Sequence, residues 1–587
     1  MWDVLIIAAD CKAVAADLRA RAAAAWPSST WHSVDDTTVL FTDGAWKPSR
    51  GGWGLLLSQG AHDVDGGRVT SDDVLRLATG DSCALQRVVP PAAFLWHTPG
   101  GGMVAATDYL GLRHVYVRET APWCAVSTSS TLLSMLAPTS VDADAVSLLA
   151  MTGSLLGDRT PYRGVRKLRP GERMEVSRRE SSSTTRPAWP TAPWVARGTP
   201  GASGAACVRV ATGAAVSAFP DLELELSGGL DSRILLAAAG SAWRARKAVT
   251  VGAPEDPDVA VASHIAAQAG VEHRVVPPAS PADADDGLLL AAVAGASRRQ
   301  DHSGNPLARL VLDQGERAMG TPLDGRVSGQ GGEYARGFYY AGQRAGASTR
   351  RHAAERLTRW RIIANDRTDA SLLTPEFAAY AEDAAVRHIV DSLMSDSTVW
   401  LTATDEYYLR ERMQRWVGLD YSVGITERII LAPFFHPAFL SWAASVAPAA
   451  KRGSKALAQT LMHLDRDLAG FPLAGGMAPE TLCGAGLPAR LLRARRDLYK
   501  VIAKARQRAS RRTRPPISTS AFAERVVLAW RRDPDQISDL AAHPMVRTDA
   551  LEQVLTGGRR LDATSVGMLI TLRGLDQALK RQVPFER

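Results

Sequence analysis

The sequence predicts two domains of different fold class: a mainly β N-terminal domain and an α/β C-terminal domain with a parallel sheet and many helices. In residues 1–185, short apolar runs are separated by Gly, Asp and Pro, which is typical of strands joined by turns. From residue 208 onward, strand-like runs alternate with helical runs, the order that builds a parallel sheet. The 587 residues are enough for more than one domain.

In the first domain, the expected strands cover residues 3–8, 38–42, 53–57, 93–96, 103–106, 114–118 and 125–127. A stretch rich in Ser, Thr, Pro, Gly and Arg follows at about 178–205, and this composition is typical of a linker. We therefore divide the chain into a domain at 1–185, a linker at 186–206 and a second domain at 207–587.

In the second domain, the expected order is strand 222–226, helix 231–239, strand 247–251, helix 257–269 and strand 271–276. Pro257 and Gly270 mark the ends of the second helix. Beyond residue 283 the chain reads as mostly helical, including a helix over 405–416. In such a sheet, ligands bind at the carboxyl ends of the strands.

The first of these strand ends carries a Gly-rich turn, Ser227-Gly228-Gly229-Leu230-Asp231-Ser232. Backbone N–H groups at a helix N-terminus suit a phosphate, and glycines permit its close approach. The two Ser hydroxyls add donors, and Asp231 offers a hard oxygen ligand for Mg²⁺. The spacing differs from a Walker loop, and no Lys follows the glycines. The alternative is a turn of small residues that only caps a helix.

This turn resembles the pyrophosphate loop of the ATP pyrophosphatases that adenylate a carboxylate, the group containing asparagine synthetase and β-lactam synthetase. Ser-Gly-Gln-Gly-Gly-Glu at 328–333 is similar to the second phosphate and metal loop of that group. The segment 433–440 resembles its Pro-Phe-Leu-Asp segment, with Glu-Arg just upstream at 427–428. Lys455 falls where the group carries a Lys that reaches the reacting phosphate. The resemblance implies an ATP pyrophosphatase (adenine nucleotide alpha hydrolase-like) domain.

The resemblance also implies the site residues. Those expected to bind ATP are Leu226, Ser227, Gly228, Gly229, Asp231, Ser232, Val251, Gly252 and Gly329. Asp231, Glu333 and Lys455 are expected to be catalytic, with Asp231 and Glu333 as the ligands of Mg²⁺. Gln330, Glu411 and Arg412 are candidates for the substrate pocket. The base that takes the amine proton stays open, with Glu411 as one candidate.

Residues 104–116 resemble a segment of the N-terminal glutaminase domain of asparagine synthetases, an α+β sandwich of the Ntn type. Those enzymes use a Cys directly after the initiator Met as nucleophile. Here Trp2 occupies that position, and the nearest Cys is Cys11. We therefore expect a degenerate domain without glutaminase activity, so the amine must come from a source other than glutamine.

The whole combination most resembles the lasso peptide macrolactam synthetases. That resemblance implies ATP-dependent adenylation of an Asp or Glu side chain in a linear precursor peptide. The peptide's N-terminal amine then closes the ring, with release of AMP and pyrophosphate. It also implies a leader peptidase and a leader-recognition protein as partners. The alternatives are a β-lactam synthetase-like ligase, against which Gln330 argues, an ammonia-dependent asparagine synthetase-like ligase, and a non-catalytic peptide-binding scaffold.

Much of the net charge of +8 comes from one segment, 490–514, with eleven basic residues and one acid. We expect an amphipathic helix there, with one apolar stripe and a basic opposite face. The basic face is either a solvated surface or a docking surface for an acidic partner. Nucleic acid is not expected, because no aromatic platform accompanies the charge. No run of about 18 apolar residues predicts a membrane span. Five scattered Cys and the lack of a basic leader predict a cytoplasmic protein with reduced thiols.

Overall fold

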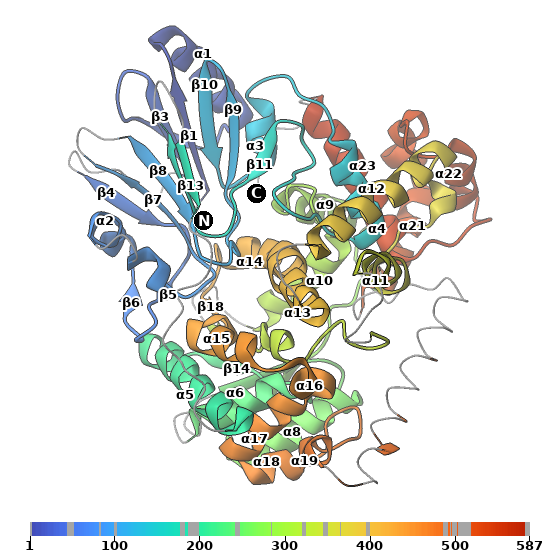
Figure 1. Ribbon diagram of the computed structural model, residues 1–587. Helices are drawn as coiled ribbons and strands as arrows, with labels where there is room; N and C mark the ends of the chain where they lie inside the picture. Colours follow the sequence, from blue (N-terminus) through green and yellow to red (C-terminus); the bar gives the residue numbers. More distant parts are fainter. Residues whose placement is uncertain are drawn as a thin grey trace.

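The computed structural model has a mixed α/β architecture, with two antiparallel sheets in the N-terminal part and a parallel sheet among many helices in the C-terminal part (Figure 1). The residues it describes are 3–43, 52–80, 84–98, 102–176, 182–185, 199–240, 247–282, 284–319, 325–343, 350–363, 366–394, 399–484, 486, 491–492, 495, 502 and 518–580. Trp2, residues 186–198 of the predicted linker and most of the basic segment 490–514 lie outside the described residues. No described helix is long and apolar enough to cross a membrane.

The N-terminal part contains two facing sheets. The first has the strand order β11-β9-β10-β1-β3-β2 and the second has the order β13-β12-β8-β7-β4. The strands are β1 Val4–Ala9, β2 Thr30–Ser33, β3 Thr38–Thr42, β4 Trp53–Leu56, β7 Ala93–His97, β8 Met103–Thr107, β9 Tyr116–Thr120, β10 Trp123–Ser127, β11 Val165–Lys167, β12 Glu172–Val176 and β13 Ser182–Thr185, with a separate hairpin of β5 Ala61–His62 and β6 Arg68–Val69. The strands β1, β3, β4, β7, β8, β9 and β10 lie close to those expected from the sequence, whereas β2, β5, β6, β11, β12 and β13 were not predicted.

The alternation of side chains along the strands explains the layers. In β1, Val4 and Ile6 belong to the core between the two sheets, whereas Leu5 and Ile7 pack against helices on the outer face. Those helices are α1 Lys12–Ala25 and α3 Ser130–Met135. The outer face of the second sheet packs on α2 Ser71–Thr79. The result is a helix–sheet–sheet–helix sandwich.

The C-terminal sheet is parallel throughout and has the strand order β16-β15-β14-β17-β18. Its strands are β14 Glu223–Glu225, β15 Lys247–Val251, β16 Glu272–Val276, β17 Arg326–Val327 and β18 Ile430–Leu431. The chain builds β14, β15 and β16 in one direction and then crosses to the other side of β14. The point where the order reverses, between β14 and β17, is where open parallel sheets bind ligands. The strands β17 and β18 are too short to leave a pattern in the sequence.

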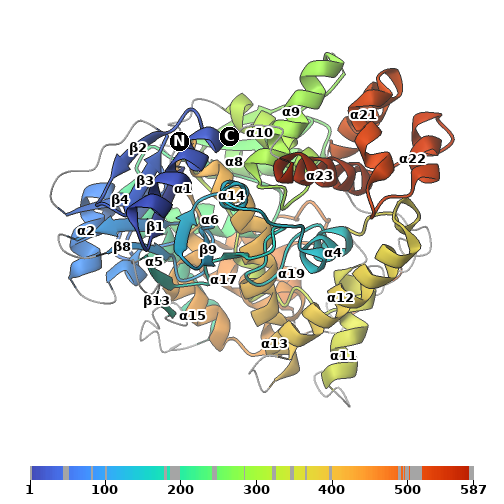
Figure 2. The ribbon, with the colours of Figure 1, turned by 90° about the horizontal axis from the view of Figure 1, so that it is seen from above.

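Helices surround this sheet, and Figure 2 shows the C-terminal α21 and α23 beside α9 and α10, with α22 further out. The helical elements are α4 Ala143–Thr152, α5 Pro200–Ala218, α6 Asp231–Ala239, α8 Pro257–Ala269, α9 Asp286–Arg299, α10 Pro306–Met319, α11 Arg350–Leu357, α12 Pro375–Leu393, α13 Trp400–Tyr407, α14 Gly418–Gly424, α15 Pro437–Ser445, α16 Pro448–Lys451, α17 Lys455–Leu464, α18 Arg466–Gly470, α19 Pro479–Cys483, α21 Thr519–Arg532, α22 Thr548–Leu555 and α23 Ala563–Leu579. Short helical turns are η1 Ala84–Arg87, η2 Gly332–Ala335, η3 Thr358–Ile362, η4 Ala370–Leu372, η6 Pro433–Phe435, η7 Arg452–Ser454 and η8 Pro534–Ala542.

The helix α5 begins at Pro200, so the end of the predicted linker, residues 200–206, is helical. Thr199 caps the helix by accepting a hydrogen bond from the N–H of Ala202, and Pro200 occupies the first turn, where its missing N–H costs nothing. A side chain at Gly204 would lie within 2.6 Å of the Trp442 ring. The small residue therefore lets α5 lie close against α15 and α17.

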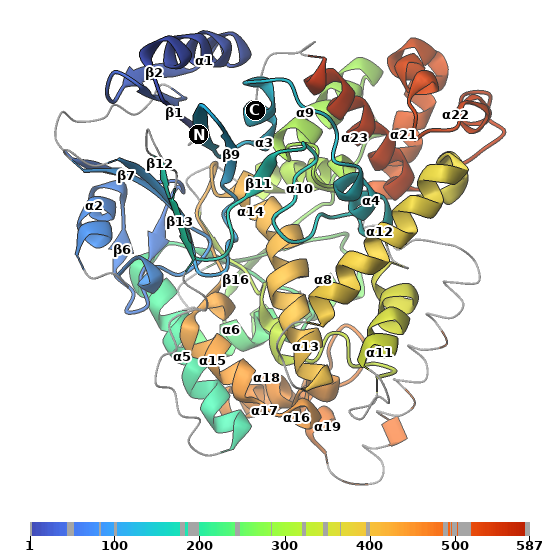
Figure 3. The same ribbon diagram turned by 45° about the horizontal axis from the view of Figure 1, so that its top comes forward.

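The helix predicted over 405–416 is present, but residues Tyr408–Val417 are wound as a π-helix, η5, between α13 and α14. This run passes through the middle of the molecule (Figure 3). Along this run, residues four apart contact the same surroundings, whereas adjacent residues point in different directions. Glu411 and Arg415 bond to the backbone at 157–159 of the N-terminal part, whereas Arg412 lies over Trp416 and faces Asp366.

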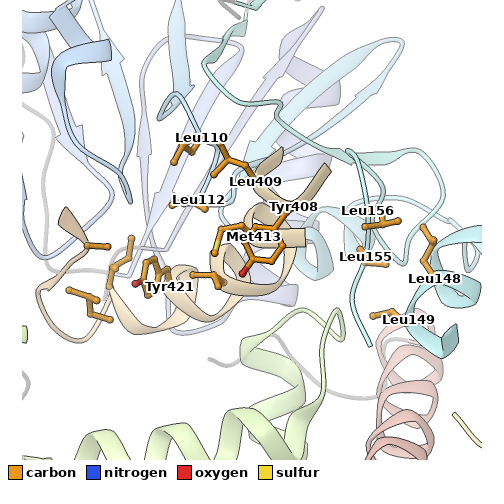
Figure 4. Close-up of a cluster of buried hydrophobic side chains, with 14 of the residues drawn as sticks. Leu110, Leu112, Leu148, Leu149, Leu155, Leu156, Tyr408, Leu409, Met413 and Tyr421 are labelled. Atoms are coloured by element: carbon orange, nitrogen blue, oxygen red, sulfur yellow. The ribbon is translucent and has the colours of Figure 1, made fainter. Parts of the chain in front are cut away.

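The two parts share one hydrophobic core, in which Leu110 and Leu112 lie beside Leu409 and Met413 (Figure 4). The turn that presents these leucines is organised by Asp108, whose carboxylate accepts hydrogen bonds from four backbone N–H groups. Arg113, at the end of that turn, is fully buried and donates to the carbonyl of Ser422 over 2.6 Å. The segment that resembles a glutaminase domain therefore joins the two parts.

Candidate active site

The first loop of the site follows β14 and is held in shape by its own serines. Ser232 Oγ accepts a hydrogen bond from the N–H of Ser227 over 3.0 Å, and the two Ser hydroxyl groups are also 3.0 Å apart. Gly228 packs against the backbone of Asp258, and its carbonyl accepts from the N–H of Ala474. The loop therefore ends at the N-terminus of α6 with the partial positive charge of that helix behind it.

The second loop follows β17 and lies directly against the first. A Cβ at Gly329 would lie 3.2 Å from the backbone nitrogen of Ser232, and one at Gly332 would lie 2.5 Å from Asp231 Oδ1. Only glycine permits this approach, because a side chain at either position would press on the first loop. The structure thus brings together two sequence motifs that lie about a hundred residues apart, at the point where the strand order reverses.

Two carboxylates and one arginine form the charged centre of the site. The Arg336 guanidinium pairs with Asp231 Oδ2 and with Glu333 Oε1, the second at 2.7 Å. The other oxygen of each carboxylate, Asp231 Oδ1 and Glu333 Oε2, is buried and has no hydrogen-bond partner in the described part of the chain. Burial raises the pKa of Asp231 to about 7, against the opposing effect of Arg336, and the nearby Glu333 raises it further. Buried carboxylate oxygens without partners are costly and call for a ligand.

These two oxygens fit a magnesium ion. Mg²⁺ takes hard oxygen ligands and is commonly held by one or two carboxylates plus substrate phosphates and water. The described residues contain no group of three or more metal-binding side chains, so Asp231 and Glu333 would be the whole protein share of such a site. The glycine-lined loops leave backbone groups beside them for the phosphates.

Three of the residues predicted to bind ATP lie where β14 and the neighbouring strand β15 end. Val251 is the last residue of β15 and is 44% exposed, and the N–H of Gly252 bonds to the carbonyl of Val276 over 2.9 Å. Leu226, directly after β14, donates its N–H to the carbonyl of Val249 in β15. The three positions therefore lie on adjacent strand ends, and their contact with ATP stays a prediction.

Lys455 is the first residue of α17, a helix that packs against α6. Gly453 and Ser454 precede it with positive φ angles of 72° and 66°, a conformation that is rare for Ser and turns the chain sharply into the helix. Among the described residues, the Lys455 ammonium group has no ion pair. The contact of this ammonium group with phosphate stays a prediction.

The three residues predicted for the substrate pocket lie apart. Gln330 is half-buried in the second loop. Arg412 lines a cavity of about 650 Å³, with its guanidinium 3.7 Å from Asp366. Glu411 accepts a hydrogen bond from the N–H of Gly157 over 2.6 Å. That contact holds one carboxylate oxygen of Glu411 against the N-terminal part.

Sequence reasoning missed a buried polar network beneath the second loop. Lys451 Nζ lies 2.7 Å from Asp405 Oδ2, which also accepts the hydroxyl of Tyr340. Tyr334, which directly follows Glu333, donates its hydroxyl to Glu406 over 3.2 Å. Burial raises the pKa of Tyr334 well above its usual value, and Glu406 adds to the rise. Tyr334 therefore stays protonated and positions the loop.

The adjacent acids at 405–406 were the available signal for this network, but their partners lie 46 and 72 residues away. No local spacing rule connects them. The network shows how the residue after Glu333 is anchored, and with it the loop that carries the carboxylate.

Comparison with known proteins covers one part of this region. The family model described as asparagine synthase matches residues 208–293, the part of the chain that contains the first loop and the strands β14, β15 and β16. No curated protein matches the chain. The match supports an asparagine synthetase-like domain in this protein and indicates an enzyme of the ATP-dependent ligase type.

Proposed function

We propose that the protein is an ATP-dependent macrolactam synthetase that closes a ring in a linear precursor peptide, as in lasso peptide biosynthesis. The observation that carries this proposal is the meeting of the two Gly-rich loops around Asp231 and Glu333, each with an unpartnered buried oxygen. The position where a glutaminase would carry its Cys holds Trp2, which favours an amine on the substrate itself.

In the first proposed step, an Asp or Glu side chain of the peptide attacks the α-phosphorus of ATP. A bond forms from the carboxylate oxygen to phosphorus, and the bond to the leaving pyrophosphate breaks. The N-terminal end of α6 and the N–H groups of the first loop face the pyrophosphate. Mg²⁺ held by Asp231 and Glu333 would supply charge neutralisation to the phosphates.

In the second proposed step, the N-terminal amine of the same peptide attacks the activated carbonyl carbon. The amide bond forms, the bond from carbon to the AMP oxygen breaks, and the amine releases its proton. Lys455 stabilises the negative charge on the tetrahedral centre as a preorganised cation. Its ammonium group is free for this role among the described residues. The general base stays unassigned, because Tyr334 stays protonated and one oxygen of Glu411 is bonded to Gly157.

The test is incubation of the purified protein with Mg²⁺-ATP and a panel of linear peptides that carry a free N-terminus and an internal Asp or Glu. Mass spectrometry should detect the loss of one water, and AMP should appear in equal amount. With ¹⁸O in the side-chain carboxylate, one label should pass to AMP, because the carboxylate oxygen attacks phosphorus. Asp231→Asn should abolish all three signals.

The matched control is Asp221→Asn, which removes an exposed carboxylate just before β14 and should change none of them. Label in AMP without ring closure would keep the adenylating site and indicate another amine, such as ammonia or a β-lactam-type intramolecular amine. No AMP with any peptide, even with a leader peptidase and a leader-recognition protein added, would favour the non-catalytic scaffold. The proposal places the reaction in the cytoplasm, where ATP and Mg²⁺ are available.

A further inference from the structure

The cavity of about 650 Å³ that Arg412 lines lies between the N-terminal part and the C-terminal helices. Its wall comes from the end of α4, the turn between α9 and α10, the segment 366–368, the run from η5 to α14, and α23. Leu149, which lines it, lies above a faint red helix of the C-terminal segment in Figure 4. The volume lies in the range of pockets that bind organic ligands. Neither of the two carboxylates of the ATP site lines this cavity.

The cavity wall contains hydrogen-bond acceptors that the protein does not use. Gln300 and Thr368 are 3% and 2% exposed, and Gln300 Oε1 and Thr368 Oγ1 have no hydrogen-bond partner. Gln300 instead donates from Nε2 to Asp420 Oδ1 over 3.1 Å. Buried polar atoms without partners are rare in native proteins, and each asks for an explanation. Both residues line the cavity, and a ligand with N–H or O–H donors would supply the missing partners.

The charge of the wall indicates the class of donor. Arg412 and Asp366 face each other across 3.7 Å, so their charges offset one another. Asp420 remains: its Oδ1 lies 3.9 Å from Arg309, and its Oδ2 has no partner among the described residues. Arg309 itself forms ion pairs with Asp313 and Glu316. A cation placed in the cavity would therefore meet a carboxylate oxygen that is free to accept.

We infer that this cavity binds a cationic group, an ammonium or a guanidinium, carried by the peptide substrate. Asp420 Oδ2 accepts from the cation, and Gln300 Oε1 and Thr368 Oγ1 accept from neighbouring N–H groups of the peptide. The cavity is larger than one cationic group requires, which leaves room for the adjoining backbone. The identity of the occupant as substrate rests on the proposed function. The N-terminal part would then contribute to substrate binding, because the end of α4 forms one wall of the cavity.

The test measures binding to the full chain without ATP, by fluorescence anisotropy of a labelled linear peptide with one Arg. The matched probe carries citrulline, which has nearly the same shape without the charge. The Arg peptide should bind at least about tenfold more tightly, as expected for a hydrogen-bonded buried charge. Asp420→Asn should remove that preference, whereas Asp391→Asn, at an exposed position of α12, should keep it.

A second pair of variants keeps the test independent of folding. Thr368→Val removes a hydroxyl that has no partner in the protein, so its melting temperature should not fall. It should still weaken peptide binding by a few-fold. Thr212→Val is the matched control, since Thr212 Oγ1 is also buried without a partner but lies in α5, away from the cavity. Equal effects of the two variants on binding would overturn the inference.

Two further measurements distinguish a peptide cation from a small-molecule cation, and failure of this inference from failure of the proposed function. If N-acetylarginine methylamide binds as tightly as the Arg peptide and displaces it, the cavity serves a small cation and the substrate assignment is overturned. Equal affinity for the Arg and citrulline peptides overturns the whole inference. ATP–pyrophosphate exchange is measured in parallel. Its absence alongside a preserved Arg preference would sink the proposed function and leave the cavity assignment standing.

Discussion

The C-terminal domain contains two clusters of buried acids and arginines, and their carboxylate oxygens differ in one respect. In the first, on α10 and β17, both oxygens of Asp313 and both of Glu316 pair with Arg299, Arg309 or Arg326. In the second, Arg336 pairs with one oxygen of Asp231 and one of Glu333, and the other two oxygens have no partner. The first cluster is complete, whereas the second has room for a ligand.

The difference also appears in the acidity of the carboxyl groups. Burial alone would raise the pKa of Glu316, but the surrounding guanidinium groups outweigh it and hold the pKa below its usual range. Burial raises the pKa of Asp231 to about 7. The opposing effect of Arg336 does not outweigh burial, and Arg336 also pairs with Glu333. Fully paired buried charges of this kind stabilise the fold, whereas carboxyl groups with strongly shifted pKa values cluster at functional sites. The fully paired cluster is therefore expected to stabilise the fold, and the partly paired cluster is the proposed site.

The largest expected effect is on activity at the incomplete cluster. Glu333→Gln keeps the shape of the side chain but removes the charge of one proposed metal ligand. Ring closure and ATP–pyrophosphate exchange should both fall at least about a thousandfold, on the order of 4 kcal/mol in the barrier. The melting temperature should change little, because Gln keeps an oxygen that can accept from Arg336, and Glu333 Oε2 has no partner to lose among the described residues. Loss of fold without specific loss of exchange would contradict the assignment of this cluster as the site.

The next effect is on stability at the complete cluster. Arg309→Met has similar length but leaves Asp313 Oδ1 and Glu316 Oε2 buried without their main partner. Breaking a buried ion pair from one side costs about 3–5 kcal/mol in the free energy of unfolding. Chemical denaturation measures it. Arg317→Met, on the same helix but outside the ion pairs, is the control. A loss below about 1 kcal/mol would show that the complete cluster does not support the fold.

A buried base at the joint between the two parts extends the comparison to pH. Lys167 is 1% exposed and donates to the carbonyl of Leu168, and burial lowers its pKa from 10.5 to about 7, with Arg415 adding to the decrease. Between these two pKa values the unfolded chain binds more protons than the folded one, so stability should rise with pH from about 7 to 10.5.

Lys167→Met should lack this rise. The difference in the free energy of unfolding between the variant and the parent protein should shrink by a few kcal/mol over that range, since one pKa unit corresponds to about 1.4 kcal/mol. Denaturant titrations at several pH values measure it. Parallel curves for the two proteins would show that Lys167 is protonated and satisfied in the fold.

The smallest expected effect concerns Arg336 itself. Its guanidinium already offsets the two carboxylates, so a divalent cation must compete with it. Arg336→Gln should increase the affinity for Mn²⁺ without nucleotide about tenfold, which corresponds to about 1.4 kcal/mol. Electron paramagnetic resonance of free Mn²⁺ measures binding directly. Arg350→Gln, away from the site, is the control. Unchanged affinity would mean that Arg336 does not share the position of the cation.

Much of the fold could be predicted from local patterns. The strand Lys247–Val251 and the helices Asp231–Ala239 and Pro257–Ala269 begin and end where periodicity, Pro and Gly place them. The two-residue strands β17 and β18 could not be predicted, because no period is visible in two residues. The π-helical winding of η5 also left no local signal in the sequence. Glu411 and Arg412 face different surroundings, because consecutive residues of a helix point in different directions.

By itself, the sequence determined the two glycine loops, the chemistry of their acids and the absence of a Cys at position 2, because each is a property of a few adjacent residues. Only the tertiary structure decided that β17 lies beside β14, which brings Gly332 against Asp231. It also decided that Arg336 joins the two carboxylates and that Gln300, Thr368 and Asp420 share one cavity. Such pairings depend on contacts between residues far apart in the chain, which no local spacing specifies.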